Sequence, residues 1–119
     1  KSFNLSSGEQ IRNFLYVGDF SKILYKSLFL KTNEKILNTG SSKNYQVKFI
    51  IDKINKLVNK GYPRYGRINL RKDEPFYLYP DLNKFKKLIK FNTETKIENG
   101  LKKTIAYIKK LKNEKNLFN

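Results

Sequence analysis

The sequence contains no cysteine and no histidine among its 119 residues, and these two absences exclude several kinds of site. Without cysteine no disulfide can form, and nothing in the sequence points to an oxidising compartment. Thiolate and imidazole are the usual zinc ligands, so a zinc site would need an unusual set of oxygen ligands. We therefore expect no metal site.

Long apolar segments are also missing. A membrane-spanning helix needs a run of about 18 apolar residues, and no such run occurs. The first ten residues, KSFNLSSGEQ, lack the apolar run of a secretory signal peptide. We expect no membrane partner and a cytoplasmic location.

The size and composition fit one folded domain with a modest core. A chain of 119 residues is too short for a two-domain enzyme. Its hydrophobic content of 39% and aromatic content of 14% argue against disorder, although 30% of the residues are charged.

The formal net charge of +16 raises the alternative of nucleic-acid binding, in which a basic surface releases counterions from phosphates. Only four of the 26 basic residues are arginine, however, and the lysines are spread along the whole chain. Arginine is the side chain that recognises bases and phosphates through paired hydrogen bonds. The codon bias of an AT-rich genome explains the charge more simply. A small basic nucleic-acid-binding module is therefore the less favoured alternative.

Residue patterns predict a mixed α/β order. Residues 3–6 and 10–17 are predicted strands, and the second has the β-branched and aromatic content that favours pleated structure. Asp19 is expected to cap a helix over about residues 20–30, where apolar positions recur at helical spacing. Residues 35–38 form a short predicted strand, which ends at the glycine and serines that follow it.

The clearest amphipathic helix is predicted for residues 45–60, with Gly61 as its stop. Residues 62–80 are irregular or strand-like, and the alternation over residues 67–71 places two arginines on one face. Asp81 is expected to cap the next helix.

A capping box formed by Thr95 and Glu98 predicts the start of the last helix, which has one apolar stripe. Residues 112–119 are a polar tail rich in lysine and asparagine. The expected fold class is therefore α/β, with about four helices and short strands.

The segment over residues 8–19 carries the most specific motif, in which Gly8, Arg12, Phe14 and Asp19 stand at fixed spacing. It resembles the G-x-x-x-R-D-F-x-x-V-x-D segment of the extended short-chain dehydrogenases/reductases, the NAD-dependent epimerases and dehydratases that act on nucleotide-sugars. Four more elements match that family in order and spacing, so the resemblance covers about residues 4–111. These elements are residues 36–42, the pair Arg71 and Glu74, residues 81–87 and residues 98–107.

The resemblance implies that residues 1–111 are the C-terminal, substrate-binding region of such an enzyme, a small mixed α/β domain beside a Rossmann-like sheet. NAD or NADP would be the cofactor of the full-length parent, and a nucleotide-diphosphate sugar would be its ligand. The family's glycine-rich cofactor loop and its tyrosine–lysine catalytic pair do not occur in the sequence. We therefore expect a missing N-terminal dinucleotide-binding half as a partner. We also expect no catalytic residue, no bound cofactor and no activity from this chain alone.

Three residues are candidates for the ligand site. In the family, the arginines at the positions of Arg12 and Arg71 commonly reach the ligand's phosphates. Two arginines from different segments can clamp a diphosphate through charge-assisted, bidentate bonds. Glu74 would orient Arg71, or bind a sugar or ribose hydroxyl. The simpler alternatives are a surface arginine on an edge strand for Arg12, and a weak exposed ion pair with Asp73 or Glu74 for Arg71.

Other residues of the motifs have structural interpretations. Asn38 is expected to close its turn through its side chain, and Gly40 to supply backbone freedom. Four tyrosines and Phe76 form either a base-stacking set or, more simply, a cover between the irregular segment and the helices. The tyrosines are Tyr62, Tyr65, Tyr77 and Tyr79.

Departures from the family pattern leave open a fragmentary or decayed gene. Asn13 stands where aspartate is usual, and Phe91 and Asn92 replace a glycine–tryptophan pair. A degenerate, stand-alone interaction domain is therefore a third alternative. The spacing before Glu74 is similar to that of ketoreductases such as the abequose synthase group, although Leu70 replaces a tyrosine.

Apolar residues near positions 20–28 would remain partly uncovered in the isolated chain. We therefore predict marginal stability or self-association, including a homodimer.

Overall fold

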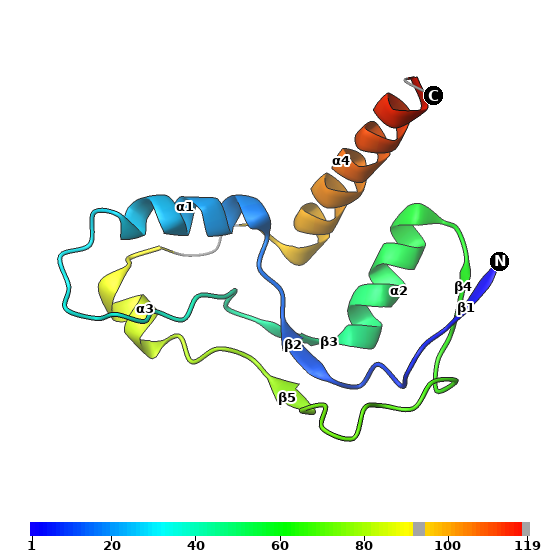
Figure 1. Cartoon of the computed structure of the whole chain (residues 1–119), viewed down its shortest axis with the longest axis horizontal. Helices are drawn as coiled ribbons and strands as arrows, with labels where there is room; N and C mark the ends of the chain where they lie inside the picture. Colours follow the sequence, from blue (N-terminus) through cyan, green and yellow to red (C-terminus); the bar gives the residue numbers. More distant parts are fainter. Residues whose placement is uncertain (92–94, 118–119) are drawn as a thin grey trace.

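The computed structural model of the chain describes residues 1–91 and 95–117 (Figure 1). Four helices and several short strands alternate along them, which confirms the predicted α/β class. In chain order the elements are β1 (Ser2–Asn4), β2 (Ile11–Asn13), α1 (Val17–Ser27), β3 (Asn44–Gln46), α2 (Val47–Val58), β4 (Tyr62–Arg64), β5 (Tyr77–Leu78), α3 (Asn83–Leu88) and α4 (Ile97–Leu117).

The strands form two small sheets. β1 and β4 pair in parallel, with Ser2 opposite Tyr62. In the second sheet β2 is the central strand, antiparallel to β3 and parallel to β5. Because β5 pairs with β2, the residues that precede β5 lie next to Arg12.

The main core lies between α1, α3 and the segments that connect them. Ile23 of α1 and Phe85 of α3 are buried together with Ile89, which follows α3. Ile50 of α2 is a separate buried residue. Partly buried apolar residues surround the first cluster: Leu15, Leu30, Leu37, Leu82, Leu88 and Phe91.

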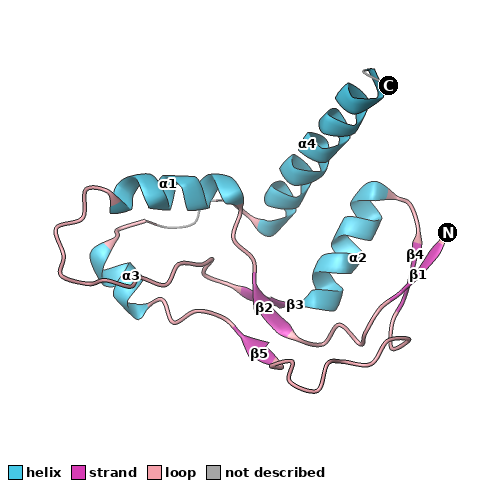
Figure 2. Ribbon diagram, in the orientation of Figure 1, coloured by secondary structure: helices cyan, strands magenta, loops and turns pink. Residues whose placement is uncertain are grey.

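The chain is open in shape, with long connections between α1 and β3 and between β4 and β5 (Figure 2). Its radius of gyration is 17.5 Å and its extents are 51 × 42 × 23 Å. A compact chain of this length would have a radius of gyration of about 13.5 Å. α4 extends away from the other elements, as Figure 1 shows. Much apolar surface therefore lies outside the core.

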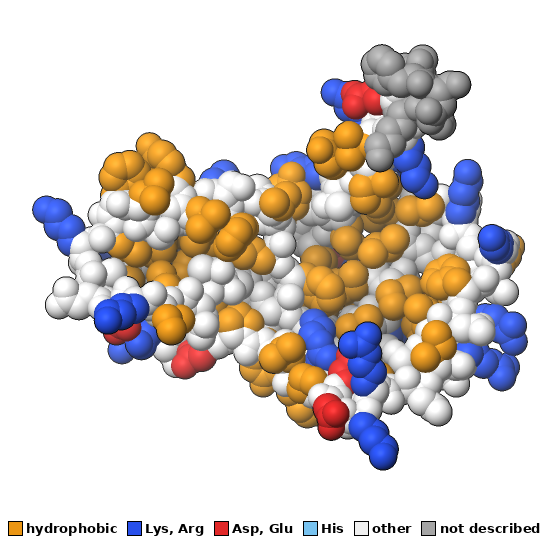
Figure 3. Space-filling view, in the orientation of Figure 1, with side chains coloured by type: hydrophobic (Ala, Val, Ile, Leu, Met, Phe, Trp, Pro, Cys, Tyr) orange, Lys and Arg blue, Asp and Glu red, His pale blue; other side chains and the backbone are white. Residues whose placement is uncertain are grey.

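On the face drawn in Figure 3, hydrophobic side chains gather over α1 and between α2 and α4, while lysines and arginines are scattered around the margin. Across the part of the chain that the structure describes, none of the helices combines the length and the hydropathy needed to cross a bilayer.

The join between β2 and α1 differs from the prediction. The strand ends at Asn13, and the carbonyl of Tyr16 already accepts hydrogen bonds from the amides of Asp19 and Phe20. α1 therefore begins at Val17, with Tyr16 at the N-cap position, and the prediction that Asp19 caps the helix is wrong. Asp19 instead lies in the first turn, where it is buried.

Residues 35–38 are not a strand, contrary to the prediction. A strand needs a neighbouring strand for its backbone groups, and no pairing of this segment occurs within residues 1–91 and 95–117. Leu37 packs on the core, whereas Ile36 is 77% exposed.

The strand-like alternation over residues 67–71 is also not realised. Gly66 has φ 68°, so the chain turns at this position. The amides of Arg67 and Ile68 then both donate to the carbonyl of Leu5. The two arginines at the ends of the segment therefore do not share one face of a strand.

Two helix termini lie near their predicted positions but have other causes. α2 ends at Val58 because Asn59 adopts the left-handed conformation with φ 51°, so Gly61 is not its stop. α3 begins at Asn83, whose amide donates to Asp81 Oδ1 at 2.9 Å. Asp81 thus initiates the turn before the helix instead of capping it.

The side chains of the predicted capping box have other partners. The hydroxyl of Thr95 donates to Asp19 at 3.0 Å, and the carboxylate of Glu98 bonds Lys53 of α2 at 2.8 Å. These contacts attach the start of α4 to α1 and α2. α4 then continues to Leu117, so residues 112–117 of the predicted tail are helical.

Candidate functional site

Arg12 lies in the middle of the three-stranded sheet, opposite Tyr45 of β3 and Leu78 of β5. Its side chain is only 19% exposed. The alternative of a surface arginine on an edge strand is therefore wrong.

The guanidinium of Arg12 is held by acceptors from two segments. Nη1 donates to the carbonyls of Ile11 at 2.8 Å and Phe76 at 3.2 Å. Nη2 donates to the carbonyl of Pro75 at 2.8 Å and to Glu74 Oε1 at 3.0 Å. Arginine has five N–H donors, so Nε–H is left for a ligand. Arg12 can supply a fixed positive charge and one hydrogen bond, but a bidentate clamp would require the release of a present bond.

Glu74 pairs with Arg12 and not with Arg71, which corrects the prediction that it orients Arg71. Its Oε1 also accepts a hydrogen bond from Gln10 Nε2 at 3.3 Å. Both donors use the same oxygen, and Oε2 has no protein partner among the described residues. The side chain of Glu74 is 29% exposed, so this second oxygen can accept a hydrogen bond from a ligand hydroxyl.

Arg71 is exposed and is not brought to Arg12 by any contact of its side chain. The carbonyl of Arg71 accepts a hydrogen bond from the amide of Glu74, so these two residues lie at opposite ends of one turn of the chain. Within the described residues its guanidinium forms no ion pair, so the predicted pairing with Asp73 or Glu74 is not present.

Asn13, the departure from the family's aspartate, ties β2 to the turn before β3. Its Nδ2 donates to the carbonyl of Ser41 at 2.9 Å and to Asn44 Oδ1 at 2.8 Å, and its Oδ1 accepts the amide of Ser41 at 2.8 Å. An ionised aspartate has no donor for the first two bonds. Asn13 therefore closes the turn in the role predicted for Asn38.

Gly40 is required for space and not for backbone freedom. Its φ is not in the left-handed range. A Cβ at this position would lie 2.6 Å from Pro80 Cγ and 2.7 Å from Asn13 Oδ1. The glycine thus lets the turn approach both β2 and the segment before α3.

Arg12 and Asn13 line a cavity of about 520 Å³ together with residues of the β5–α3 connection, including Tyr79 and Asp81. Its volume is in the range of small-molecule sites. Neither Glu74 nor Arg71 is part of its lining. Of the three predicted site residues, Arg12 and Glu74 thus form a pair, and Arg71 is separate from it.

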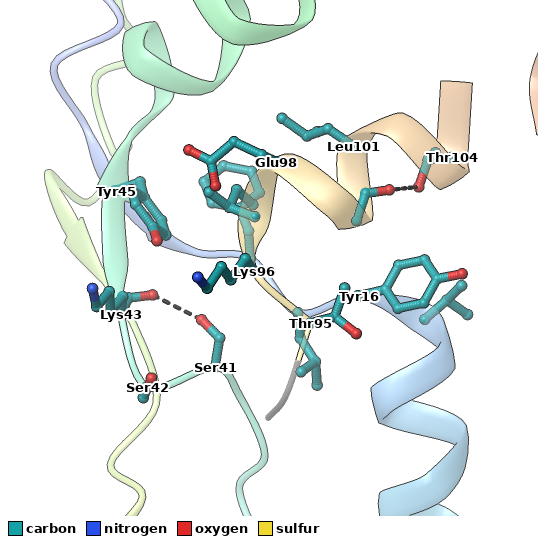
Figure 4. A pocket seen from close by; sticks show the side chains of 15 residues that line it. Tyr16, Ser41, Ser42, Lys43, Tyr45, Thr95, Lys96, Glu98, Leu101 and Thr104 are labelled. Carbon is teal, nitrogen blue, oxygen red and sulfur yellow. Dashed lines mark hydrogen bonds between the residues drawn. The ribbon is translucent and has the colours of Figure 1, made fainter. Parts of the chain in front are cut away.

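A larger cavity of about 750 Å³ lies between the β2–α1 join, the turn before β3 and the start of α4 (Figure 4). Lys96, directly before α4, and Glu98, in its first turn, face Tyr45 and the turn residues 41–43 across it. It contains none of the three predicted site residues.

The aromatic set does not form the predicted cover. Tyr62 is 73% exposed and Tyr77 is 66% exposed, and Phe76 and Tyr79 are also exposed. Tyr65 alone of the set packs as expected, since its hydroxyl donates to Asp52 of α2 at 2.6 Å.

Two shifted pKa values belong to contacts of α2. Partial burial and the hydrogen bond to Asp52 raise the pKa of Tyr65. The hydrogen bond from Lys53 lowers the pKa of the exposed Glu98 carboxyl. These contacts connect α2 to its neighbours, so they are structural.

No protein-family model matches the chain. It is 32% identical over 103 residues to UDP-glucuronate 4-epimerase of Thermodesulfobacterium geofontis, which covers 86% of this chain and 31% of the relative. It is 28% identical over 119 residues to UDP-N-acetyl-alpha-D-glucosaminuronate decarboxylase of Bacillus cytotoxicus, covering 90% and 35%. It is also 32% identical over 110 residues to UDP-glucuronic acid decarboxylase 1 of Xenopus tropicalis, covering 87% and 24%.

Solved structures agree in fold. UDP-glucose 4-epimerase from Thermotoga maritima, solved with UDP-glucose, superposes with a TM-score of 0.81 at 22% identity, over 93% of this chain and 36% of that one. UDP-glucuronic acid 4-epimerase from Bacillus cereus, in complex with UDP-glucuronic acid and NAD, gives 0.79 at 23% identity, over 93% and 36%.

The chain therefore has the fold of about a third of an extended short-chain dehydrogenase/reductase. It is a homologue of one part of the UDP-sugar epimerases and decarboxylases of that family, and it spans about a third or less of their length. The family predicted from the five motifs is thus confirmed, and nothing in these relatives supports the nucleic-acid alternative.

Proposed function

We propose that the chain is the sugar-nucleotide-binding part of an NAD-dependent UDP-sugar epimerase or decarboxylase. The observation that carries this proposal is the 32% identity, over 103 residues, to a UDP-glucuronate 4-epimerase. Because the sequence relatives named above act on UDP-linked sugars, a UDP-sugar is the proposed ligand, with uracil as its base.

The contacts of Arg12 and Glu74 and the exposure of Arg71 support the following proposed roles. Arg12 supplies a positive charge, fixed by four hydrogen bonds, and its Nε–H for one phosphate. Arg71, whose exposed guanidinium has no partner in the described part of the chain, supplies the bidentate contact. Glu74 offers its unpaired Oε2 to a ribose or sugar hydroxyl.

Cofactor binding and chemistry are assigned to sequence outside these 119 residues. The six glycines stand at positions 8, 18, 40, 61, 66 and 100, so no loop with glycines three apart can receive a pyrophosphate. The residues of this chain therefore do not fit NAD. We also propose that the protein is located in the cytoplasm.

The test is calorimetric titration of the chain with UDP, with CDP, GDP and dTDP for comparison. A double variant, Arg12→Ala/Arg71→Ala, is compared with Arg64→Ala/Arg67→Ala. Each removes two of the four arginines and the same charge, but neither residue of the second pair lines the cavity beside Arg12. We expect UDP binding that the first variant loses, by at least tenfold, and that the second retains.

Equal losses in the two double variants would show that general charge, and not a site, attracts the nucleotide. Absence of UDP binding by a folded chain would refute a binding subsite within these residues.

A further inference from the structure

Gln10, immediately before β2, is an unusual residue for its environment. It is 4% exposed, which is rare for glutamine. Its Nε2 donates to Glu74 Oε1 at 3.3 Å, whereas its Oε1 is buried and has no hydrogen-bond partner among residues 1–91 and 95–117.

The free-energy cost of a buried, unpaired carbonyl oxygen is larger than the free energy that one hydrogen bond returns. An apolar side chain of similar size would avoid the cost of the unpaired oxygen entirely. Stability of the fold therefore does not explain a glutamine at this position. A group that is retained at a cost to stability points to a role in function.

We propose that Gln10 is a positioning residue for Glu74, so that Glu74 can accept a ligand hydroxyl. This inference rests on the proposed function. Arg12 Nη2 and Gln10 Nε2 both donate to the same carboxylate oxygen, at 3.0 Å and 3.3 Å. With Oε1 held by two donors, the carboxylate cannot turn, and Oε2 keeps one orientation. Arg12 alone would leave the carboxylate free to exchange its two oxygens.

The shared oxygen of Glu74 also connects Gln10 with Arg12. Gln10 directly precedes β2 and Arg12 lies on it, one on each side of Ile11, and Glu74 reaches them from 62 to 64 positions further along the chain. Gln10 is thus placed to act on the ligand through Glu74 and not by direct contact.

The test replaces Gln10 by methionine, which has similar size and no polar end. Gln46→Met is the matched control, because Gln46 is exposed on β3. We expect Gln10→Met to leave the urea-unfolding free energy unchanged or raise it, and to weaken UDP binding about three- to tenfold. Binding of inorganic pyrophosphate, which has no hydroxyl for Glu74, should not change. In a Glu74→Gln background, Gln10→Met should have no further effect on UDP binding.

Several results would overturn the proposal. Lower stability with unchanged UDP affinity would show that Gln10 is structural. Equal losses for UDP and pyrophosphate would show that it acts on the phosphates. An additive effect in the Glu74→Gln background would show that it does not act through Glu74.

A separate measurement covers the case in which the chain binds no UDP at all, which would refute the proposed function. The Nη2–H signal of Arg12 in the NMR spectrum reports whether its partner Glu74 is fixed, because Nη2 donates to Glu74. Loss of its protection from exchange in Gln10→Met, but not in Gln46→Met, would still support the positioning role. An unchanged signal would overturn it.

Discussion

The buried carboxylate of Asp19 accepts two hydrogen bonds from Thr95, 76 positions further along the chain. The amide of Thr95 donates to Oδ2 at 3.1 Å, and its hydroxyl donates to Oδ1 at 3.0 Å. Asp19 is 2% exposed. The family's motif aspartate thus joins the first turn of α1 to the residues before α4, and it has no role in capping its own helix.

Replacement of Asp19 by alanine should destabilise the chain by about 2–3 kcal/mol, because it leaves two partly buried donors without an acceptor. Thr95→Ala should cost about half as much, since the backbone amide still donates. Thr95→Ser keeps the hydroxyl and should remain near the wild type. Urea unfolding of the three variants measures these differences. A loss below about 0.5 kcal/mol for Asp19→Ala would contradict a stabilising link, since surface substitutions usually stay within that range.

Two glycines of the family motifs should respond to alanine in opposite directions. At Gly40 a Cβ would lie 2.6 Å from Pro80 Cγ, so Gly40→Ala should destabilise by about 1–3 kcal/mol. At Gly100, inside α4, the nearest atoms would lie at ordinary contact distances of 3.4 Å and more. Alanine favours a helix over glycine by about 0.5–1 kcal/mol, so Gly100→Ala should stabilise.

Thermal unfolding of both variants and of the wild type checks the two predicted changes in stability. Each serves as the control for the other, because both add one methyl group. A stable Gly40→Ala variant would show that the turn can move away from β2.

The strongest local signals in the sequence predicted the family and most of the helices correctly. The motif over residues 8–19 has a strand followed by a helix, and the apolar period over residues 45–60 gives α2, because both patterns are read within one element. Residues 35–38 failed for the opposite reason. Their apolar content suits a strand, but a strand forms only beside another, and that neighbour cannot be seen in the segment itself.

The site shows the same limit. Arg12 and Glu74 were both candidates, but their pairing depends on β5 lying beside β2, which no spacing in the sequence reveals. Gln10 was missed altogether. Its only signal was a polar residue directly before the strand that carries Arg12, and burial, which gives that residue its meaning, is a property of the fold.

The apolar surface around α1 should cause self-association of the isolated chain. Leu24, Tyr25, Leu28 and Phe29 are between 51% and 78% exposed, which confirms the uncovered face expected near residues 20–28. Burying a leucine or phenylalanine side chain contributes about 1.5–3 kcal/mol. We predict that sedimentation velocity shows a mass that increases with concentration, and that Leu28→Lys/Phe29→Lys shifts the chain toward monomer by at least tenfold in dissociation constant.

Tyr62→Lys is the control for that experiment, because Tyr62 is 73% exposed but lies on β4, away from α1. It removes an exposed aromatic side chain and adds one positive charge, so it tests whether added charge alone disperses the chain. We expect it to associate as the wild type does. A wild-type chain that stays monomeric at every concentration and unfolds in one sharp transition would refute the prediction, because the exposed face would then need no partner.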